Sequence, residues 1–130
     1  IYAPDLQALA RWADYLVVIT AGGAATRHLI NGAVLDALGP RGFLVNVSRG
    51  TVVDEQALLR ALQDKRIAGA ALDVFEHEPK VPRELFALDN VVLVPHIASA
   101  TEETRQAMAD RVVDNLDAFF ASGKLISPAA

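Results

Sequence analysis

The stretch Phe43-Leu-Val-Asn-Val-Ser-Arg-Gly-Thr-Val-Val-Asp-Glu-Gln-Ala-Leu-Leu-Arg-Ala-Leu62 begins as a short apolar run and continues as a helical pattern. Residues 43–47 are typical of a buried strand. Asp54 stands where a helix N-cap is expected, with Glu55 in the first turn and Lys65-Arg66 in the last, as the helix dipole favours. The apolar stripe of this helix is Ala57, Leu58, Ala61 and Leu62. The stretch therefore predicts a strand, a loop and a helix.

The same alternation of strand and helix extends over the rest of the chain. Three further apolar runs are predicted to be strands: residues 15–19, 67–74 and 91–94. The strands start about 25 residues apart with mostly helical segments between them, which is the spacing of βαβ units. Because the runs do not alternate in polarity, we expect a parallel sheet with helices on both faces. The predicted class is α/β, a doubly wound sheet with about four parallel strands.

Helical and loop segments fill the intervals between these strands. Residues 6–13 carry apolar side chains at helical spacing, and residues 26–38 are expected to form one or two short helical turns. Residues 76–90 contain two prolines and many charges, and are predicted to be a loop. Ser99-Ala-Thr-Glu102 has the spacing of a capping box before a long helix that Gly123 ends. We assign residues 1–122 to one domain and residues 123–130 to a C-terminal tail.

Composition limits the classes of function. The chain has 130 residues, a hydrophobic fraction of 52% and a net charge of -4. This length suits one domain or part of one, and the apolar content excludes a disordered chain. An acidic chain without a basic stripe is not expected to bind nucleic acid, and no apolar run reaches the roughly 18 residues that a membrane span needs. The absence of cysteine excludes a thiolate metal site and fits a cytoplasmic location.

Three polar residues stand just past the ends of predicted strands: Arg49, Glu78 and His96. In open α/β sheets, ligands bind outside the carboxyl ends of the strands, so these side chains can face one crevice. The planar guanidinium of Arg is suited to clamp a carboxylate, and His suits general acid/base chemistry near neutrality. A carboxylate such as that of Glu78 favours the charged imidazolium of His96. The set predicts a site that holds an anionic substrate and moves a proton.

Solvated loop charges are the simpler interpretation of such residues, and two features argue against it here. Gly50 lets the backbone approach a ligand closely, and Asp73 at the end of an apolar strand needs a polar partner or a ligand. His28 and His77 have no such context and are interpreted as surface residues. Metal binding is the weaker alternative, because no helical pair of His ligands is present. Its candidate ligands are Asp73, Glu76, His77 and Glu78.

Longer motifs surround these strand ends. They are Val45-Asn-Val-Ser-Arg-Gly-Thr-Val-Val-Asp54, Gly69-Ala-Ala-Leu-Asp-Val-Phe-Glu-His-Glu-Pro79 and Val94-Pro-His-Ile-Ala-Ser-Ala-Thr101. In order and spacing they resemble the D-isomer-specific 2-hydroxyacid dehydrogenases, and Asn90-Val-Val-Leu93 resembles the last strand of that family. Thr20-Ala-Gly-Gly-Ala-Ala-Thr-Arg-His-Leu29 is similar to the glyoxylate/hydroxypyruvate reductase branch. The resemblance covers nearly the whole chain and implies the second half of a Rossmann-like NAD(P)-binding domain.

The resemblance implies a role for each matching residue. Arg49 would bind the substrate carboxylate and the C2 oxygen, His96 would exchange a proton with that oxygen, and Glu78 would keep His96 protonated and oriented. The implied cofactor-binding residues are Thr20, Ala21, Val47, Ser48, Arg49, Asp73, His96, Ala98 and Ser99. The implied reaction is hydride transfer between NAD or NADP and a small 2-keto or 2-hydroxy acid of the glyoxylate or hydroxypyruvate type.

The family's Gly-x-Gly-x-x-Gly turn and its cofactor-selecting side chain would lie before Ile1. We therefore interpret the chain as a fragment and expect residues 1–130 alone to have no turnover. The resemblance also implies a homodimer. Some proteins of this fold serve as corepressor-like scaffolds that use the nucleotide as a conformational ligand, which is the alternative function. The combination of Arg49, Glu78 and His96 favours the enzyme, because a scaffold does not need all three.

Overall fold

A computed structural model describes residues 2–128 of the chain. Its contacts divide the chain into two compact units, residues 1–96 and residues 97–130. The first unit contains the sheet and three of the helices, and the second contains one long helix and the tail. Each unit is described by itself below, and Ile1, Ala129 and Ala130 lie outside the described residues.

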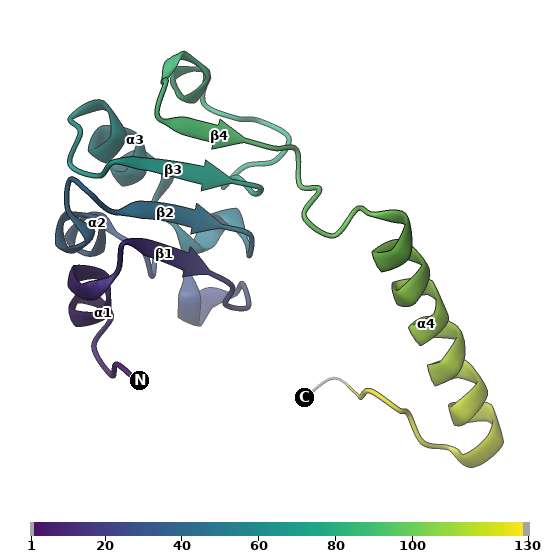
Figure 1. Cartoon of the computed structure of the whole chain (residues 1–130). Coiled ribbons are helices and arrows are strands. Elements are labelled where there is room, and N and C mark those ends of the chain that lie inside the picture. Colours follow the sequence, from purple (N-terminus) through teal and green to yellow (C-terminus); the bar gives the residue numbers. More distant parts are fainter. Residues whose placement is uncertain (1, 129–130) are drawn as a thin grey trace. The chain divides into compact units, whose positions relative to one another are not determined.

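Four parallel strands form the sheet of the first unit (Figure 1). They are β1 (Tyr15–Val18), β2 (Phe43–Asn46), β3 (Gly69–Leu72) and β4 (Val91–Leu93), side by side in chain order. The register pairs Tyr15 with Phe43, Phe43 with Gly69, and Ala70 with Val91. The predicted α/β class and its four parallel strands are confirmed, although β3 is shorter than the predicted run of residues 67–74. All four carboxyl ends lie at one edge of the sheet, where the candidate residues follow.

The helices of this unit begin at side-chain caps. They are α1 (Leu6–Trp12), α2 (Gly32–Leu38) and α3 (Glu55–Gln63), with caps Asp5, Asn31 and Asp54. Short 3-10 helices cover Ala24–Thr26, Gly50–Val52 and Arg83–Ala87. The last of these lies in the segment predicted to be a loop. Lys65-Arg66 was expected in the last turn of α3, but the helix ends at Gln63 and its basic residue there is Arg60.

The helices cover one face of the sheet in residues 2–96. Leu16, Leu44 and Leu72 point to that face and are buried in a core with α3 residues such as Leu58 and Leu62. The other face leaves large apolar side chains exposed, namely Tyr15, Val17, Phe43 and Val92. We predicted helices on both faces, and this unit covers only one. The reason is topological, because right-handed crossovers between strands that neighbour in chain order place α2 and α3 on the same side, and α1 packs against α2.

The second unit is built on α4 (Glu102–Ser122). Its N-cap is Thr101, whose Oγ1 accepts the N–H of Thr104 at 3.2 Å, so the predicted capping box at Ser99 is wrong by two residues. Gly123 ends the helix with φ 71°, as predicted. Asn115 holds the tail through the N–H groups of Ile126 and Ser127, both at 3.0 Å. No helix within residues 2–128 is both long and apolar enough to cross a membrane.

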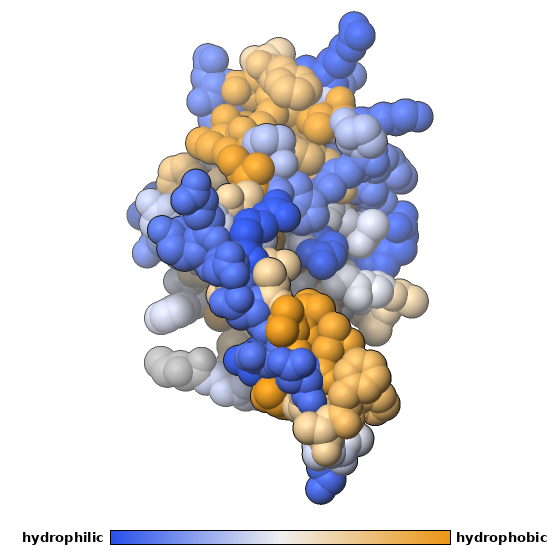
Figure 2. Space-filling view, turned by 90° about the vertical axis from the view of Figure 1, so that its right-hand side faces the viewer, coloured by the Kyte–Doolittle hydropathy of each residue, from blue (hydrophilic) through white to orange (hydrophobic). Residues whose placement is uncertain are grey.

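Apolar side chains lie exposed along α4 and its tail. They are Met108, Val112, Val113, Leu116, Phe119, Phe120, Leu125 and Ile126. Figure 2 shows part of this unit as apolar surface. Such an apolar stripe on a helix is typical of a face that packs against another element.

Candidate active site

The turn after β2 is shaped by a buried amide. Asn46 is only 1% exposed, and its Oδ1 accepts hydrogen bonds from the N–H of Ser48 at 3.1 Å and from Ser48 Oγ at 2.9 Å. Its Nδ2 donates to the carbonyl oxygen of Arg49 at 3.2 Å. Because buried amides need partners for both ends, this side chain fixes the turn from inside. Arg49 projects from the turn and is exposed, with its Nη1 donating to the Ser48 carbonyl at 2.7 Å.

A hollow lies beside this turn, at the carboxyl ends of β1 and β2. It measures about 730 Å³, which is within the roughly 300–1,000 Å³ typical of ligand pockets. Five predicted cofactor-binding residues line it together: Thr20, Ala21, Val47, Ser48 and Arg49. Gly22 also lines it, and a Cβ at this position would lie 2.7 Å from Arg49 Cγ. The absence of a side chain at Gly22 therefore leaves room for the stem of Arg49.

Glu78 and His96 meet beyond the ends of β3 and β4. The Oε2 atom of Glu78 lies 2.9 Å from Nδ1 of His96, and its Oε1 accepts the N–H of Phe75 at 3.0 Å. The hydrogen bond with His96 lowers the pKa of the Glu78 carboxyl, and the Phe75 N–H adds to this effect. Glu78 is therefore a carboxylate at neutral pH, and it orients the imidazole so that Nε2 is the nitrogen left for a ligand.

The backbone of His96 adopts a rare conformation. Its φ is 55°, in the left-handed region that residues other than glycine seldom occupy. Such conformations cost about 1–3 kcal/mol and cluster at functional sites, where the surrounding structure holds them. The N–H of His96 donates to the carbonyl of Val94 at 3.1 Å, which forms a tight turn directly after β4.

The remaining predicted cofactor-binding residues are Asp73, Ala98 and Ser99. Asp73 follows β3 directly, is 3% exposed, and donates its N–H to the carbonyl of Asn46 at 3.0 Å. Its charge opposes the lowering of the pKa of Glu78, so the two carboxyl groups are electrostatically coupled. Ala98 and Ser99 belong to the unit of residues 97–130, and their part in cofactor binding stays a prediction.

Comparisons with known proteins identify the family of this chain. A family model described as "D-isomer specific 2-hydroxyacid dehydrogenase, NAD binding domain" matches residues 1–98. The chain belongs to this family. It is 55% identical over 127 residues to a 2-ketogluconate reductase of Gluconobacter oxydans, and 54% identical to a glyoxylate/hydroxypyruvate reductase of Arabidopsis thaliana. Both alignments cover 98% of this chain and 41% of the relative, so the chain spans about two fifths of these proteins.

A solved structure is similar to nearly all of the chain. It is the NADPH-dependent glyoxylate/hydroxypyruvate reductase of Sinorhizobium meliloti in complex with NADP and malonate. The TM-score is 0.95 and the sequence identity 53%, over 99% of this chain and 40% of that chain. The Rossmann-like α/β architecture of a partial NAD-binding domain is thus shared with a cofactor-bound relative.

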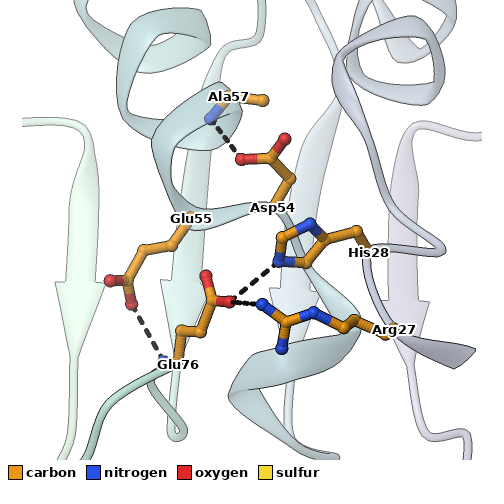
Figure 3. Close-up of polar contacts among 6 residues, drawn as sticks. All are labelled: Arg27, His28, Asp54, Glu55, Ala57 and Glu76. Atoms are coloured by element: carbon orange, nitrogen blue, oxygen red, sulfur yellow. Dashed lines mark hydrogen bonds and ion pairs between the residues drawn. The ribbon is translucent and has the colours of Figure 1, made fainter. Parts of the chain in front are cut away.

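A second polar cluster in this 2-hydroxyacid dehydrogenase domain was missed by the sequence reasoning. Figure 3 shows Arg27 and His28 converging on the carboxylate of Glu76, while Glu55 reaches the backbone of residue 76. His28 is interpreted from the sequence as a surface residue; its side chain is 35% exposed, and its contact with Glu76 was not foreseen. His77 is exposed, as predicted. The cluster could not be predicted from residue spacing, since Arg27 and His28 lie 49 and 48 residues before Glu76 in the sequence.

The predicted alternative of metal binding has no matching cluster of ligands among the described residues. Within residues 2–128, no three His, Asp or Glu side chains gather closely enough to hold a metal ion. The crowded carboxylates of this dehydrogenase domain instead face Arg27, His28, His96 and backbone N–H groups.

The two buried carboxyl groups of the cluster are expected to affect stability with opposite pH dependence. Burial raises the pKa of Glu55, and the nearby Glu76 charge adds to this, against the Glu76 N–H and the charge of His77. Burial also disfavours the Glu76 carboxylate, but hydrogen bonds and charges from His28 and Arg27 outweigh it and lower the pKa of Glu76. A carboxyl group whose pKa is lowered by folding stabilises the fold at pH values above its unfolded pKa, about 4.3. This contribution to stability is lost as the pH falls through the folded pKa. A carboxyl group whose pKa is raised by folding instead destabilises the fold as the pH rises.

Urea unfolding at several pH values tests this expectation. Relative to the parent protein, Glu55→Gln should gain stability as the pH rises from about 4 to 7, because the parent then ionises a buried carboxyl. Glu76→Gln should lose stability over the same interval, because the parent then gains its ion pairs with Arg27 and His28. Two variants whose stability differs from the parent by a constant amount across this range would contradict the assignment.

Proposed function

We propose that the protein containing this chain is an NAD(P)H-dependent reductase of small 2-keto acids, of the glyoxylate and hydroxypyruvate type. The observation that carries the proposal is the pair of Glu78 and His96 at 2.9 Å, just past the sheet edge that Arg49 also follows. A scaffold that only senses a nucleotide does not require an oriented proton carrier and an arginine at the same edge of the sheet. The family membership and the similarity to glyoxylate/hydroxypyruvate reductases support the same conclusion.

The hollow at the ends of β1 and β2 fits the nicotinamide end of a dinucleotide. Small residues and glycines line it, and they let a flat ring approach the backbone. Thr20, Ala21, Val47 and Ser48 would contact the cofactor there, with Asp73 at the end of the neighbouring strand. When bound, NAD(P)H supplies the hydride that adds to C2 of the keto acid.

The side chains of this chain then perform three tasks. The Arg49 guanidinium holds the substrate carboxylate and polarises the C2 oxygen, which suits its planar fork of donors. His96 donates a proton from Nε2 to the C2 oxygen as that oxygen gains negative charge. Glu78 accepts the Nδ1 hydrogen of His96, so it fixes the ring and stabilises the imidazolium form. In the direction of oxidation, His96 takes the hydroxyl proton back at the same nitrogen.

The proposal includes a cytoplasmic homodimer. Exposed apolar side chains on the open sheet face and along α4 support further packing partners, and a second copy is one of them. The absence of cysteine from the sequence supports a reducing compartment such as the cytoplasm.

An assay of the intact protein tests the function directly. Oxidation of NADH and NADPH is followed with glyoxylate, hydroxypyruvate and 2-ketogluconate as separate substrates, the last because one relative is a 2-ketogluconate reductase. We expect turnover with at least one of these acids and none with an aldehyde that lacks the carboxylate. The proposal fails if correctly folded, cofactor-binding protein reduces none of them.

Arg49→Lys is expected to raise KM for the keto acid by about 10- to 100-fold, the loss of one or two charge-assisted hydrogen bonds. The lysine keeps the positive charge and loses the bidentate fork. Steady-state kinetics with glyoxylate measure the change. The matched control is Arg41→Lys, an exposed arginine before β2 at the opposite end of the strand, which should leave KM unchanged. Equal effects of the two substitutions would contradict the role of Arg49.

A further inference from the structure

The peptide that joins Phe75 to Glu76 is held unusually closely. A Cβ on Gly50 would lie 1.9 Å from the carbonyl carbon of Phe75, 2.0 Å from its oxygen and 2.4 Å from the nitrogen of Glu76. The backbone of residue 50 therefore packs directly against this peptide. Gly50 follows Arg49, so the segment after β2 and the segment after β3 are in contact at this point.

The side chain of Glu76 is fixed from a third segment. Its Oε1 accepts from Arg27 Nη2 at 2.7 Å and lies 2.9 Å from His28 Nε2, and the side chain is 9% exposed (Figure 3). His28 itself has φ 50° and donates its N–H to the carbonyl of Thr51 at 2.9 Å. A left-handed histidine held by backbone and side-chain bonds indicates a conformation that the surroundings enforce.

Glu55 holds the backbone of the same residue. Its Oε1 accepts the N–H of Glu76 at 3.2 Å, and the side chain belongs to the first turn of α3. The helix is anchored in the core by Leu58 and Leu62, so Glu55 is a rigid attachment point. A buried carboxyl group is costly without a partner, and the Glu55 carboxyl accepts the backbone N–H of Glu76.

The peptide between Phe75 and Glu76, which Gly50 and Glu55 hold in place, is next to Glu78, the residue that orients His96. We call these contacts, together with those of Arg27 and His28 to Glu76, the clamp. The N–H of Phe75 donates to Glu78 Oε1 at 3.0 Å, and Oε2 of the same carboxylate binds His96 Nδ1 at 2.9 Å. Phe75 carries both this N–H and the carbonyl that packs against Gly50, so a shift of the 75–76 peptide is expected to move the N–H that fixes Glu78. The contacts therefore form a continuous path from Arg27, His28 and Glu55 through residues 75 and 76 to Glu78.

We propose that Glu76, held by Arg27, His28 and Glu55, is a positioning residue that sets the orientation of Glu78 and, through it, of His96. The inference rests on the proposed function, because the orientation of His96 matters most if His96 transfers a proton. Glu76 acts through its neighbours and does not touch the substrate. The role differs from general stabilisation in that its loss changes the orientation of the His96 ring and its contact with Glu78.

The kinetic test uses the intact enzyme and the substitution Glu76→Gln, which keeps size and removes charge. We expect kcat to fall about 10-fold, as for other small misplacements of catalytic groups, with KM for the cofactor unchanged. The pH profile of kcat should shift in the same direction as in Glu78→Gln. The charged groups that face Glu76 are Arg27, His28 and Glu55, and those that face Glu78 are His96 and Asp73.

A double-mutant cycle separates positioning from an independent effect. If Glu76 acts through Glu78, Glu76→Gln should have little further effect on kcat in a Glu78→Gln background. Arg27→Gln removes one partner of Glu76 at a half-exposed side chain and should also lower kcat. Arg27→Lys keeps the positive charge and should retain most of the kcat that Arg27→Gln loses. Asp36→Asn is the matched control, because it removes an Arg66–Asp36 ion pair of the same chemistry elsewhere in the unit. The control should leave kcat and its pH profile unchanged.

A spectroscopic measurement tests the clamp without turnover. The ring ¹⁵N signals of His96 should move in Glu76→Gln in the direction seen in Glu78→Gln, and stay in place in Asp36→Asn. Unchanged His96 signals, or additive losses of kcat in the double variant, overturn the positioning role while leaving the proposed function intact. Inactivity of the parent protein with every keto acid overturns the proposed function, and the His96 signals then still decide on the clamp.

Discussion

Replacing His96 with alanine in the intact enzyme is expected to lower kcat for keto-acid reduction by about 10²- to 10⁴-fold, the usual contribution of a general acid/base. The reason lies in the site geometry. Nδ1 is committed to Glu78 at 2.9 Å, so Nε2 is the nitrogen that carries the proton to the substrate. An alanine leaves the developing oxyanion without a donor at that place.

Two measurements distinguish this role from a binding role. Binding of NADH or NADPH, followed by titration of cofactor fluorescence, should be largely retained in His96→Ala. His77→Ala is the matched control, because His77 is an exposed histidine one residue before Glu78 and is not bonded to it. We expect the control to retain full turnover. Full turnover in His96→Ala would remove the proposed proton carrier from the mechanism.

The sheet was predictable because its information is local. Short apolar runs predicted all four strands, and the caps Asp54 and Gly123 marked helix ends by their own chemistry. Which faces of the sheet the helices cover could not be predicted from local sequence in this way. Continuous apolar runs indicate burial on both faces, whereas the chain order of the four strands puts the crossover helices α2 and α3 on one face. The other face of this unit thus carries exposed apolar side chains.

The site was predictable in part for the same reason. Arg49 and His96 follow β2 and β4 closely, and Glu78 lies in the turn after β3, so parallel topology places all three at one edge. Residues that act across long sequence separations left no pattern. Glu76 pairs with side chains 48 and 49 residues away, and its partner His28 looked like an ordinary loop histidine. Likewise, Ser99 and Thr101 offer equal capping chemistry in the sequence, and only the observed start of α4 at Glu102 selects Thr101.

Gly50 illustrates how much of this site depends on close backbone packing. Its φ is not in the left-handed region, so glycine is not required for its backbone angle. It is required for space, because a methyl group would overlap the backbone of Phe75 and Glu76, which cannot rotate away as a side chain can. Gly42 and Gly22 differ in that their nearest atoms belong mainly to the flexible side chains of Leu38 and Arg49.

Gly50→Ala is therefore expected to destabilise the protein by about 3 kcal/mol or more, the upper range for overpacking, and to abolish activity by displacing the 75–78 turn. The matched control is Gly32→Ala in the first turn of α2, where the nearest atom to a new Cβ is Ala57 Cβ at 3.9 Å. That variant should be neutral or more stable by up to about 1 kcal/mol, because alanine loses less chain entropy in a helix. The free energy of unfolding in urea measures both. Similar values for the two variants would mean that the segments after β2 and β3 can separate, and the clamp on Glu76 would then lose its rigid base.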